Sequence, residues 1–214
     1  MNEAGLGAGN RAQPRCQGSA SLAVGLMARL CLIAFLLVMG LASADGAEQN
    51  RLAPCLACHG ETGQSQAAAV PSLGGQPAQY SLIQLYMFRE RLRLGAPMND
   101  LTKQFSDDDL TAISNAIAKL PAPRRSTEAA DPQRLARGKA LAEQNHCNVC
   151  HRADFSGQEN VPRLAGQRED YLLKALTEYK TGVRHGYDAT MAEALQPVDK
   201  NELGTLAYFL AHAR

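Results

Sequence analysis

Two five-residue stretches decide the fold: Cys55-Leu56-Ala57-Cys58-His59 and Cys147-Asn148-Val149-Cys150-His151. Each reads Cys-x-x-Cys-His, which is the attachment signature of a c-type haem. Two cysteines at this spacing on one helical turn both reach the vinyl groups of a porphyrin, and the imidazole of the following histidine meets the iron. The motifs therefore predict two covalently bound haem c groups, with thioether bonds to Cys55, Cys58, Cys147 and Cys150.

Pairs of cysteines at CxxC spacing also occur in zinc ribbons and in redox dithiols, so these two classes of site are the alternatives. The pairs that begin at Cys55 and Cys147 lie too far apart in the chain for a typical zinc ribbon. A thioredoxin-like dithiol needs a βαβ context, and the sequence shows no such pattern. Because a histidine directly follows both pairs, the sequence favours haem attachment.

The composition is that of an ordinary globular protein. Of the 214 residues, 45% are hydrophobic and 20% are charged, and the formal net charge is +1. The longest run of like charges is Asp107-Asp108-Asp109. A charge near zero without a basic run gives no electrostatic attraction to nucleic acid, so no nucleic-acid partner is expected. Apart from the motif cysteines, the chain has Cys16 and Cys31 near its N-terminus.

The apolar run Leu30–Leu41 follows Arg29 and precedes Ala42-Ser43-Ala44, which is the order of a secretory signal peptide. The run is shorter than the roughly 20 apolar residues of a membrane span. We therefore expect residues 1–44 to be a cleaved leader whose true start is Met27, with an uncleaved anchor as the alternative. Export fits a c-type haem, which bacteria attach outside the cytoplasm, so the predicted location is the periplasm.

The chain is an internal duplication. Pro71–Gln76 (PSLGGQ) matches Pro162–Gln167 (PRLAGQ), and further along Met98 matches Met191. The stretch between the two copies is rich in proline and arginine and has the composition of a linker. We expect a first domain, a linker and a second domain, over residues 45–121, 122–130 and 131–214 respectively.

Apolar residues recur at helical spacing in each half, and no stretch shows the alternation of a strand. We expect helices over roughly 80–91 and 171–180, and another that runs from Asp131-Pro132 into the second haem motif. Capping boxes, Ser106 to Asp109 and Asp199 to Glu202, mark the start of the last helix of each half. The predicted fold class is all-α, with two small tandem domains after the signal peptide.

Each iron needs two axial ligands, and the motif histidines His59 and His151 are expected to supply the proximal one. Met98 and Met191 are the candidates for the sixth position, because both occupy the same place in an irregular stretch before a capped helix. A thioether favours ferrous iron and closes the second face of the haem, which favours electron transfer over catalysis. The alternatives are an open iron site or one of two residues without a counterpart in the repeat, Met87 and His185.

Two further pairs of residues match in the repeat, and each leaves two interpretations open. The carbonyls of Pro71 and Pro162 either accept the Nδ1 hydrogen of the proximal imidazole or belong to ordinary loop prolines. Arg93 and Arg184 either pair with haem propionates or are solvated charges at the end of a helix.

These elements resemble the dihaem cytochrome c4 family, which is built of two class I cytochrome c domains. The resemblance covers residues 45–214 and is carried by CLACHG and CNVCH, by PSLGGQ and PRLAGQ, and by the later methionines and capped helices. It implies His/Met ligation of both irons and a crossing of N- and C-terminal helices, for which Gly138 and Tyr208 are suited. The helix before Cys55 looks short, because Pro54 directly precedes the motif, so the first haem is expected to be more exposed.

The resemblance also implies a periplasmic electron carrier, often membrane-associated, that passes electrons toward terminal oxidases. The expected partners are redox proteins, namely a cytochrome oxidase, a bc1-type complex or a periplasmic dehydrogenase, and the chain itself is not expected to be an enzyme. Two alternatives stay open. One is an electron-transfer subunit of a sulfide- or alcohol-oxidising dehydrogenase, and the other is a haem enzyme with one open iron site.

Overall fold

The computed structural model describes residues 51–125, 129–187 and 189–213. The predicted leader and Met27 lie outside these ranges, as do Cys16 and Cys31. Within them the regular elements are helices, and an isolated β-bridge joins Gln158 to Val161, which confirms the all-α prediction. None of the described helices has the length and apolar character needed to span a bilayer.

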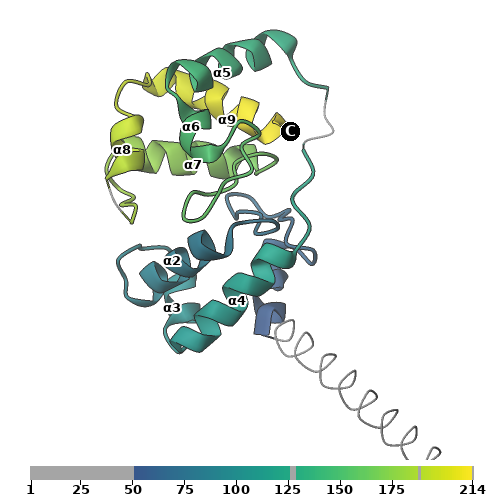
Figure 1. Cartoon of the computed structure of the whole chain (residues 1–214), viewed down its shortest axis with the longest axis vertical. Helices are drawn as coiled ribbons and strands as arrows, with labels where there is room; N and C mark the ends of the chain where they lie inside the picture. Colours follow the sequence, from purple (N-terminus) through teal and green to yellow (C-terminus); the bar gives the residue numbers. More distant parts are fainter. Residues whose placement is uncertain (1–50, 126–128, 188, 214) are drawn as a thin grey trace, which may run out of the picture. The chain divides into compact units, whose positions relative to one another are not determined.

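The helices fall into the two halves that the repeat predicts, and both halves belong to one compact unit, Gly46–Arg214 (Figure 1). In the first half, residues 51–59 are helical. They are followed by α2 (Ala78–Arg89), α3 (Met98–Thr102) and α4 (Asp107–Lys119). The second half contains α5 (Pro132–Gln144), α6 (Cys147–His151), α7 (Glu169–Lys180), α8 (Thr190–Ala194), the 3-10 turn η1 (Lys200–Glu202) and α9 (Leu203–His212).

Helices α2 and α7 begin slightly before the predicted residues 80 and 171, and both begin in the same way. Pro77 has φ −55° and ψ 135°, and Arg168 has φ −57° and ψ 132°, so the chain enters each helix from an extended residue. The fixed φ of proline suits this position. The repeat has therefore kept the backbone of the helix start while changing the residue there.

The predicted capping box of α4 is confirmed. The Ser106 hydroxyl accepts from the backbone N–H of Asp109 at 3.1 Å, and the Asp109 carboxylate accepts from the backbone N–H of Ser106 at 3.1 Å. Two N–H groups that the helix leaves unpaired are thereby satisfied.

The prediction of a second capping box, from Asp199 to Glu202, is wrong. Asp199 accepts from the backbone N–H of Asn201 at 2.8 Å and starts the 3-10 turn η1 instead. The Glu202 carboxylate forms an ion pair with Arg137 of α5 and so does not return to the cap. A contact between elements has replaced the local cap, and α9 begins only at Leu203.

Helix α5 begins as predicted, with the Asp131 carboxylate accepting from the backbone N–H of Gln133 at 2.8 Å. It does not continue into the haem motif. It ends at Gln144, and His146 adopts a left-handed conformation with φ +54° before α6 starts. This turn breaks the helical ladder and gives the second motif a direction of its own.

The crossing of α5 and α9 involves the predicted glycine but a different aromatic residue. A Cβ added to Gly138 would lie 2.4 Å from the Cβ of Phe209, so Phe209 and not Tyr208 packs on the glycine. Successive residues of a helix point about 100° apart, because one turn takes 3.6 residues. Tyr208 therefore points elsewhere, and its hydroxyl accepts from the backbone N–H of Asp131 at 2.7 Å.

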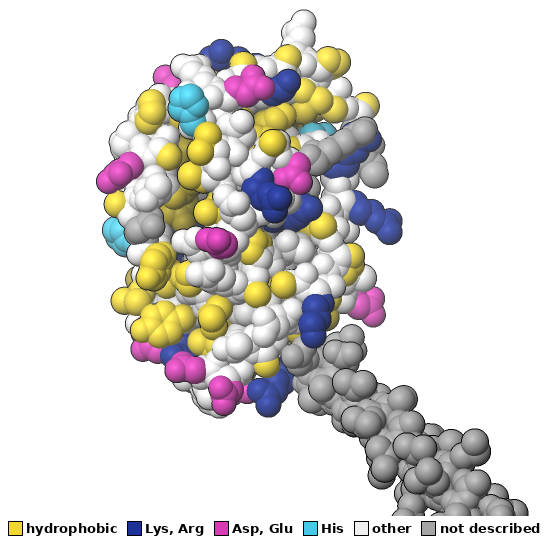
Figure 2. Space-filling view, in the orientation of Figure 1, with side chains coloured by type: hydrophobic (Ala, Val, Ile, Leu, Met, Phe, Trp, Pro, Cys, Tyr) yellow, Lys and Arg dark blue, Asp and Glu magenta, His cyan; other side chains and the backbone are white. Residues whose placement is uncertain are grey.

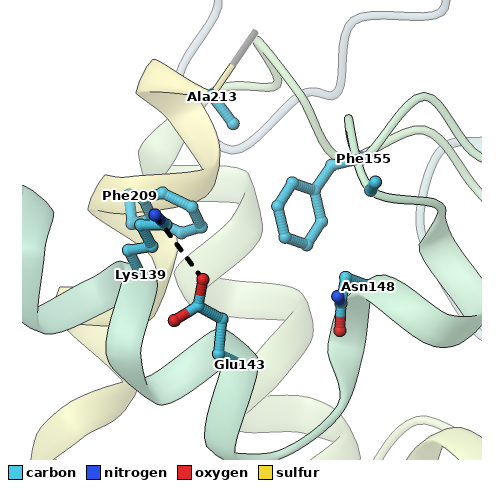
Figure 3. Close-up of a pocket in the computed structure, with 7 residues that line it drawn as sticks. Lys139, Glu143, Asn148, Phe155, Phe209 and Ala213 are labelled. Carbon is cyan, nitrogen blue, oxygen red and sulfur yellow. Dashed lines mark ion pairs between the residues drawn. The ribbon is translucent and has the colours of Figure 1, made fainter.

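The ring of Phe209 also meets Phe155 edge to face, with centroids 5.5 Å apart. Figure 3 shows these two rings at a cavity of about 180 Å³ beside α5, where Lys139 and Glu143 form an ion pair at 3.6 Å. None of the predicted site residues lines this cavity. It is a packing feature of the helix crossing.

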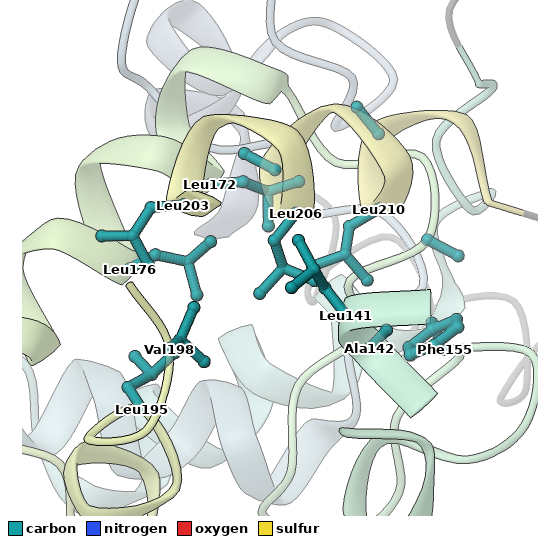
Figure 4. Close-up of a cluster of buried hydrophobic side chains, with 13 residues drawn as sticks. Leu141, Ala142, Phe155, Leu172, Leu176, Leu195, Val198, Leu203, Leu206 and Leu210 are labelled. Carbon is teal, nitrogen blue, oxygen red and sulfur yellow. The ribbon is translucent and has the colours of Figure 1, made fainter. Parts of the chain in front are cut away.

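Each half has its own apolar core. Figure 4 shows leucines of α5, α7 and α9 pointing toward one another in the second half, among them Leu141, Leu176 and Leu206. In the first half, helices 51–59, α2 and α4 contribute Leu52, Leu85, Leu110, Ile113, Ala116 and Ile117. Met98 and Met191 are half-buried against the core of their own half.

Replacing Gly138 with alanine should destabilise the holoprotein by roughly 1–3 kcal/mol, because the new methyl group overpacks the crossing of α5 and α9. The measurement is the free energy of unfolding in denaturant. Gly204→Ala on α9 is the matched control, since a Cβ there meets nothing within 4 Å. The control should be neutral or stabilising by up to about 1 kcal/mol. Equal effects of the two substitutions would contradict the close approach at Gly138.

Candidate functional site

The first motif lies on the helix over residues 51–59, which projects its three reactive side chains within one turn. Cys55 is half-buried, Cys58 is exposed and His59 is only 7% exposed. Burial raises the pKa of the Cys55 thiol, and the neighbouring Cys58 adds to that rise. The motif thus presents two cysteine side chains and a buried imidazole from one short helical segment.

The second motif occupies α6 and repeats this pattern of exposure. Cys147 is half-buried, Cys150 is exposed and His151 is 6% exposed. Burial likewise raises the pKa of the Cys147 thiol. Two separate helices therefore present the same three groups in the same order, although the residues between the cysteines differ.

The two motif histidines are held by the two prolines of the repeat. The Nδ1–H of His59 donates to the Pro71 carbonyl at 2.8 Å, and that of His151 donates to the Pro162 carbonyl at 2.9 Å. The interpretation of these prolines as ordinary loop residues is thereby excluded. Burial lowers the pKa of both histidines, and the carbonyls only partly oppose it, so each ring is neutral with Nε2 as its free nitrogen. Neutral imidazole is the form that binds a metal.

A cavity of about 610 Å³ brings together the site residues predicted for the first half. Its lining includes Cys55, Cys58, His59 and Met98. Met98 is the first residue of the short helix α3, and so it does not lie in the irregular stretch that the sequence indicated. Cofactor sites usually have volumes of roughly 300–1,000 Å³, so the cavity has the capacity for a porphyrin.

In the second half, the structure shows the motif on α6 and the contact of His151 with the Pro162 carbonyl. Met191 lies in α8, another short helix, and packs against the core of its half. The Nε of Arg163, directly after Pro162, is buried without a hydrogen-bond partner. The assignment of a haem site in the second half is therefore based on the match of its motif, proline and methionine to those of the first half.

Arg93 and Arg184 both line the large cavity, and their partners are neutral. Arg93 donates to Gln84 Oε1 at 2.6 Å, and both guanidinium groups donate to the Tyr171 hydroxyl at 3.3 Å. Arg184 is 6% exposed, its Nε has no partner, and the Tyr80 hydroxyl accepts from its Nη2 at 3.4 Å. Within the described ranges no carboxylate pairs with either arginine, so the interpretation as solvated helix-end charges is wrong for Arg184.

The positive charges of Arg93 and Arg184 act on the pKa values of Tyr171 and Tyr80, which line the same cavity. Burial raises the pKa of Tyr171, but the charges of Arg184 and Arg93 outweigh burial and bring that pKa down to about 8. For Tyr80 burial prevails, helped by Tyr171, and the pKa rises to about 12. Buried charges are normally paired, so a cavity with two unpaired cations fits an anionic ligand. A haem with its propionates meets this requirement, and its thioether and iron partners line the same cavity.

The two alternative iron ligands, Met87 and His185, differ in their surroundings. Met87 is buried in α2 at 5% exposure, His185 is exposed although it lines the large cavity, and His146 is exposed. The tyrosines at the cavity, Tyr80 and Tyr171, were not predicted as site residues. Their matching positions in the repeat are the signal that points to them.

Known proteins resemble this chain in both sequence and structure. The family model for cytochrome c matches residues 135–213. Cytochrome c4 of Azotobacter vinelandii is 34% identical over 178 residues, which covers 73% of this chain and 83% of the relative. The thiosulfate dehydrogenase electron acceptor of Stutzerimonas stutzeri (strain A1501) is 31% identical over 196 residues, with coverages of 84% and 91%.

A solved structure adds the comparison in three dimensions. The crystal structure of reduced recombinant cytochrome c4 from Pseudomonas stutzeri aligns with a TM-score of 0.69 at 27% identity, covering 79% of this chain and 98% of that one. The alignments span both halves, which confirms the resemblance noted on the two CxxCH and PxLxGQ elements. The chain therefore belongs to the cytochrome c4 family of dihaem electron-transfer cytochromes and carries two covalently bound haem c groups.

Proposed function

We propose that this chain is an exported electron carrier of the periplasm that uses two His/Met-ligated haems. Residues 45–121 and 131–214 are the two haem domains, joined by the linker 122–130. His59 and His151 are the proximal iron ligands, and Met98 and Met191 are the distal ones. The thioether bonds are formed by Cys55, Cys58, Cys147 and Cys150.

The observation that carries this proposal is the cavity of about 610 Å³ that holds both motif cysteines, His59 and Met98. Cys55, Cys58, His59 and Met98 would hold a haem there, and its iron would supply one-electron redox chemistry. The Pro71 carbonyl orients the imidazole through Nδ1, and α3 presents the thioether of Met98 to the same cavity. With an imidazole and a thioether as ligands, no coordination position is left for a substrate, which supports a carrier and argues against an enzyme.

The arginines at the cavity supply the counter-charges for the propionates. Arg184 has a free Nε in a buried position, and Arg93 reaches the same tyrosine from the other half. A carboxylate that accepts from a guanidinium makes a short, strong hydrogen bond, and it removes the cost of an unpaired buried charge.

The partners in this proposal are redox proteins. They are a bc1-type complex or a periplasmic dehydrogenase as donor and a cytochrome oxidase as acceptor, with loose association to the membrane. The relative named as a thiosulfate dehydrogenase electron acceptor supports a dehydrogenase as one donor, and it keeps the role of a dehydrogenase subunit as the second candidate. Acidic and basic side chains are interspersed on the face drawn in Figure 2, which fits a carrier that docks transiently without binding nucleic acid.

Replacing Met98 with alanine should remove about half of the far-red band of the oxidised protein that reports iron–thioether bonds, because one of two haems loses its thioether. The potential of that haem should fall by on the order of 0.1 V or more, since a thioether favours ferrous iron. Met191→Ala should do the same to the other haem. A spectroelectrochemical titration measures both quantities. Met87→Ala is the control, and a full band in Met98→Ala would refute the ligand assignment.

Replacing Arg184 with glutamine should lower the potential of the haem held by His59 by on the order of tens of millivolts, because a nearby positive charge favours the reduced iron. Arg184→Lys keeps the charge and should shift that potential less. The titration has to resolve the two haems. A change confined to the haem held by His151 would contradict the placement of Arg184 at the first cavity.

The export assignment predicts that the protein purified from the periplasm begins at Asp45. Edman sequencing or intact mass of the holoprotein measures the N-terminus. An intact leader on the mature protein would favour the anchored alternative, and peptides from residues 11–15 of the precursor would exclude Met27 as the start.

A further inference from the structure

Two glutamines of the repeat form reciprocal hydrogen bonds between the halves. Gln167 of the second half accepts from the Ser72 N–H and donates to the Ser72 carbonyl, both at 2.8 Å. Gln76 of the first half accepts from the Arg163 N–H at 3.0 Å and donates to the Arg163 carbonyl at 2.9 Å. Each side-chain amide thus pairs with both backbone groups of one residue in the opposite half.

Both glutamines are buried, at 5% exposure for Gln76 and 3% for Gln167. An amide side chain has one carbonyl acceptor and an NH₂ donor, which matches the N–H and C=O that an extended residue presents on one side. The backbone N–H can pair only with the amide oxygen, so the orientation of each amide is fixed by its partners. Each glutamine therefore occupies a site that is specific for an amide.

Of the two backbone groups that each glutamine contacts, the N–H belongs to the peptide unit whose carbonyl holds a histidine. The Ser72 N–H and the Pro71 carbonyl are two ends of one peptide group, and that carbonyl accepts from His59 Nδ1. In the other half, the N–H that follows Pro162 meets Gln76, while the Pro162 carbonyl accepts from His151 Nδ1. A chain of hydrogen bonds therefore runs from each histidine, through one peptide, to a glutamine of the other half.

Hydrogen bonds in such a chain strengthen one another, because a peptide whose N–H donates has a more polarised carbonyl. A stronger acceptor on Nδ1 makes the imidazole a more basic ligand and fixes the orientation of its ring. A more basic imidazole stabilises ferric iron and lowers the reduction potential. The amide of one half should thus act on the iron of the other.

We propose that Gln167 and Gln76 are positioning residues that act across the halves, so that Gln167 tunes the haem bound by His59 and Gln76 tunes the haem bound by His151. This inference rests on the proposed function, because it takes both histidines as iron ligands. The contact between the two halves then contributes to both reduction potentials.

The test uses the full-length holoprotein with Gln167→Leu and Gln76→Leu made separately, since leucine has a similar size and removes both hydrogen bonds. At a fixed applied potential, Gln167→Leu should raise the ferrous-to-ferric ratio of the haem bound by His59 about two- to fourfold. Gln76→Leu should do so for the haem bound by His151. Haem methyl resonances in NMR follow the two irons separately.

A second readout is the Nδ1–H resonance of each histidine in the reduced, diamagnetic protein. In Gln167→Leu the signal of His59 should move upfield, as expected for a weaker hydrogen bond, while that of His151 stays in place. Gln64→Leu is the matched control, because its amide contacts the Arg124 carbonyl at 3.3 Å and not a peptide next to a histidine. The control should leave the ferrous-to-ferric ratio of both haems and the Nδ1–H resonances of both histidines unchanged.

Equal shifts at both haems in each variant would mean that the glutamines only hold the halves together, and this result would overturn the proposal. The proposal would also be overturned if the ferrous-to-ferric ratio changed only at the haem in the half that carries the substitution, or if it changed at neither haem. If Gln167→Leu does not fold, Gln167→Asn replaces it, because the shorter amide cannot reach both groups of Ser72. The assignment of His59 as an iron ligand is tested separately with His59→Ala. If that assignment is wrong, the variant keeps the low-spin haem spectrum.

Discussion

The rest of the structure depends on the hydrogen bond between a buried imidazole and a prolyl carbonyl. A buried N–H without a partner is costly, so the chain after each motif has to return to its histidine. That return places Pro71 and Pro162 within 2.9 Å of the rings and fixes the loops that follow them. Those loops in turn position the glutamines that join the halves and the starts of α2 and α7.

The two halves satisfy this constraint with different side chains. The carbonyl of Gly63 accepts from the Leu73 N–H at 2.8 Å, and the carbonyl of Phe155 accepts from the Leu164 N–H at 2.9 Å, so the same loop is closed at equivalent points. Both residues have positive φ, +76° and +54°. Glycine adopts this conformation freely, whereas Phe155 adopts it while its ring packs on Phe209 of α9. The duplication has kept the backbone path of this loop and changed the side chains that pack beside it.

The cavity of the first half is lined by positive charge from both halves. Arg184 comes from the second half and is buried at the cavity that holds His59, next to Arg93 of the first half. The two cations share neutral tyrosine and glutamine partners, and an anion close by would offset the cost of burying their charge. In the proposed function the propionates of a haem supply that anion, which would link haem binding to the contact between the halves.

The sequence alone determined what depends on residues close together in the chain. A CxxCH motif lies within one helical turn, and the caps at Ser106 and Asp131 reach only two or three residues ahead, so the chemistry, the all-α class and two helix starts were predictable. The tertiary structure alone decided that Phe209 meets Gly138 and that Arg184 and Gln167 contact the opposite half. These contacts join residues far apart in the chain, and which side chains meet there depends on helix rotation and on the docking of the halves, which local sequence does not specify.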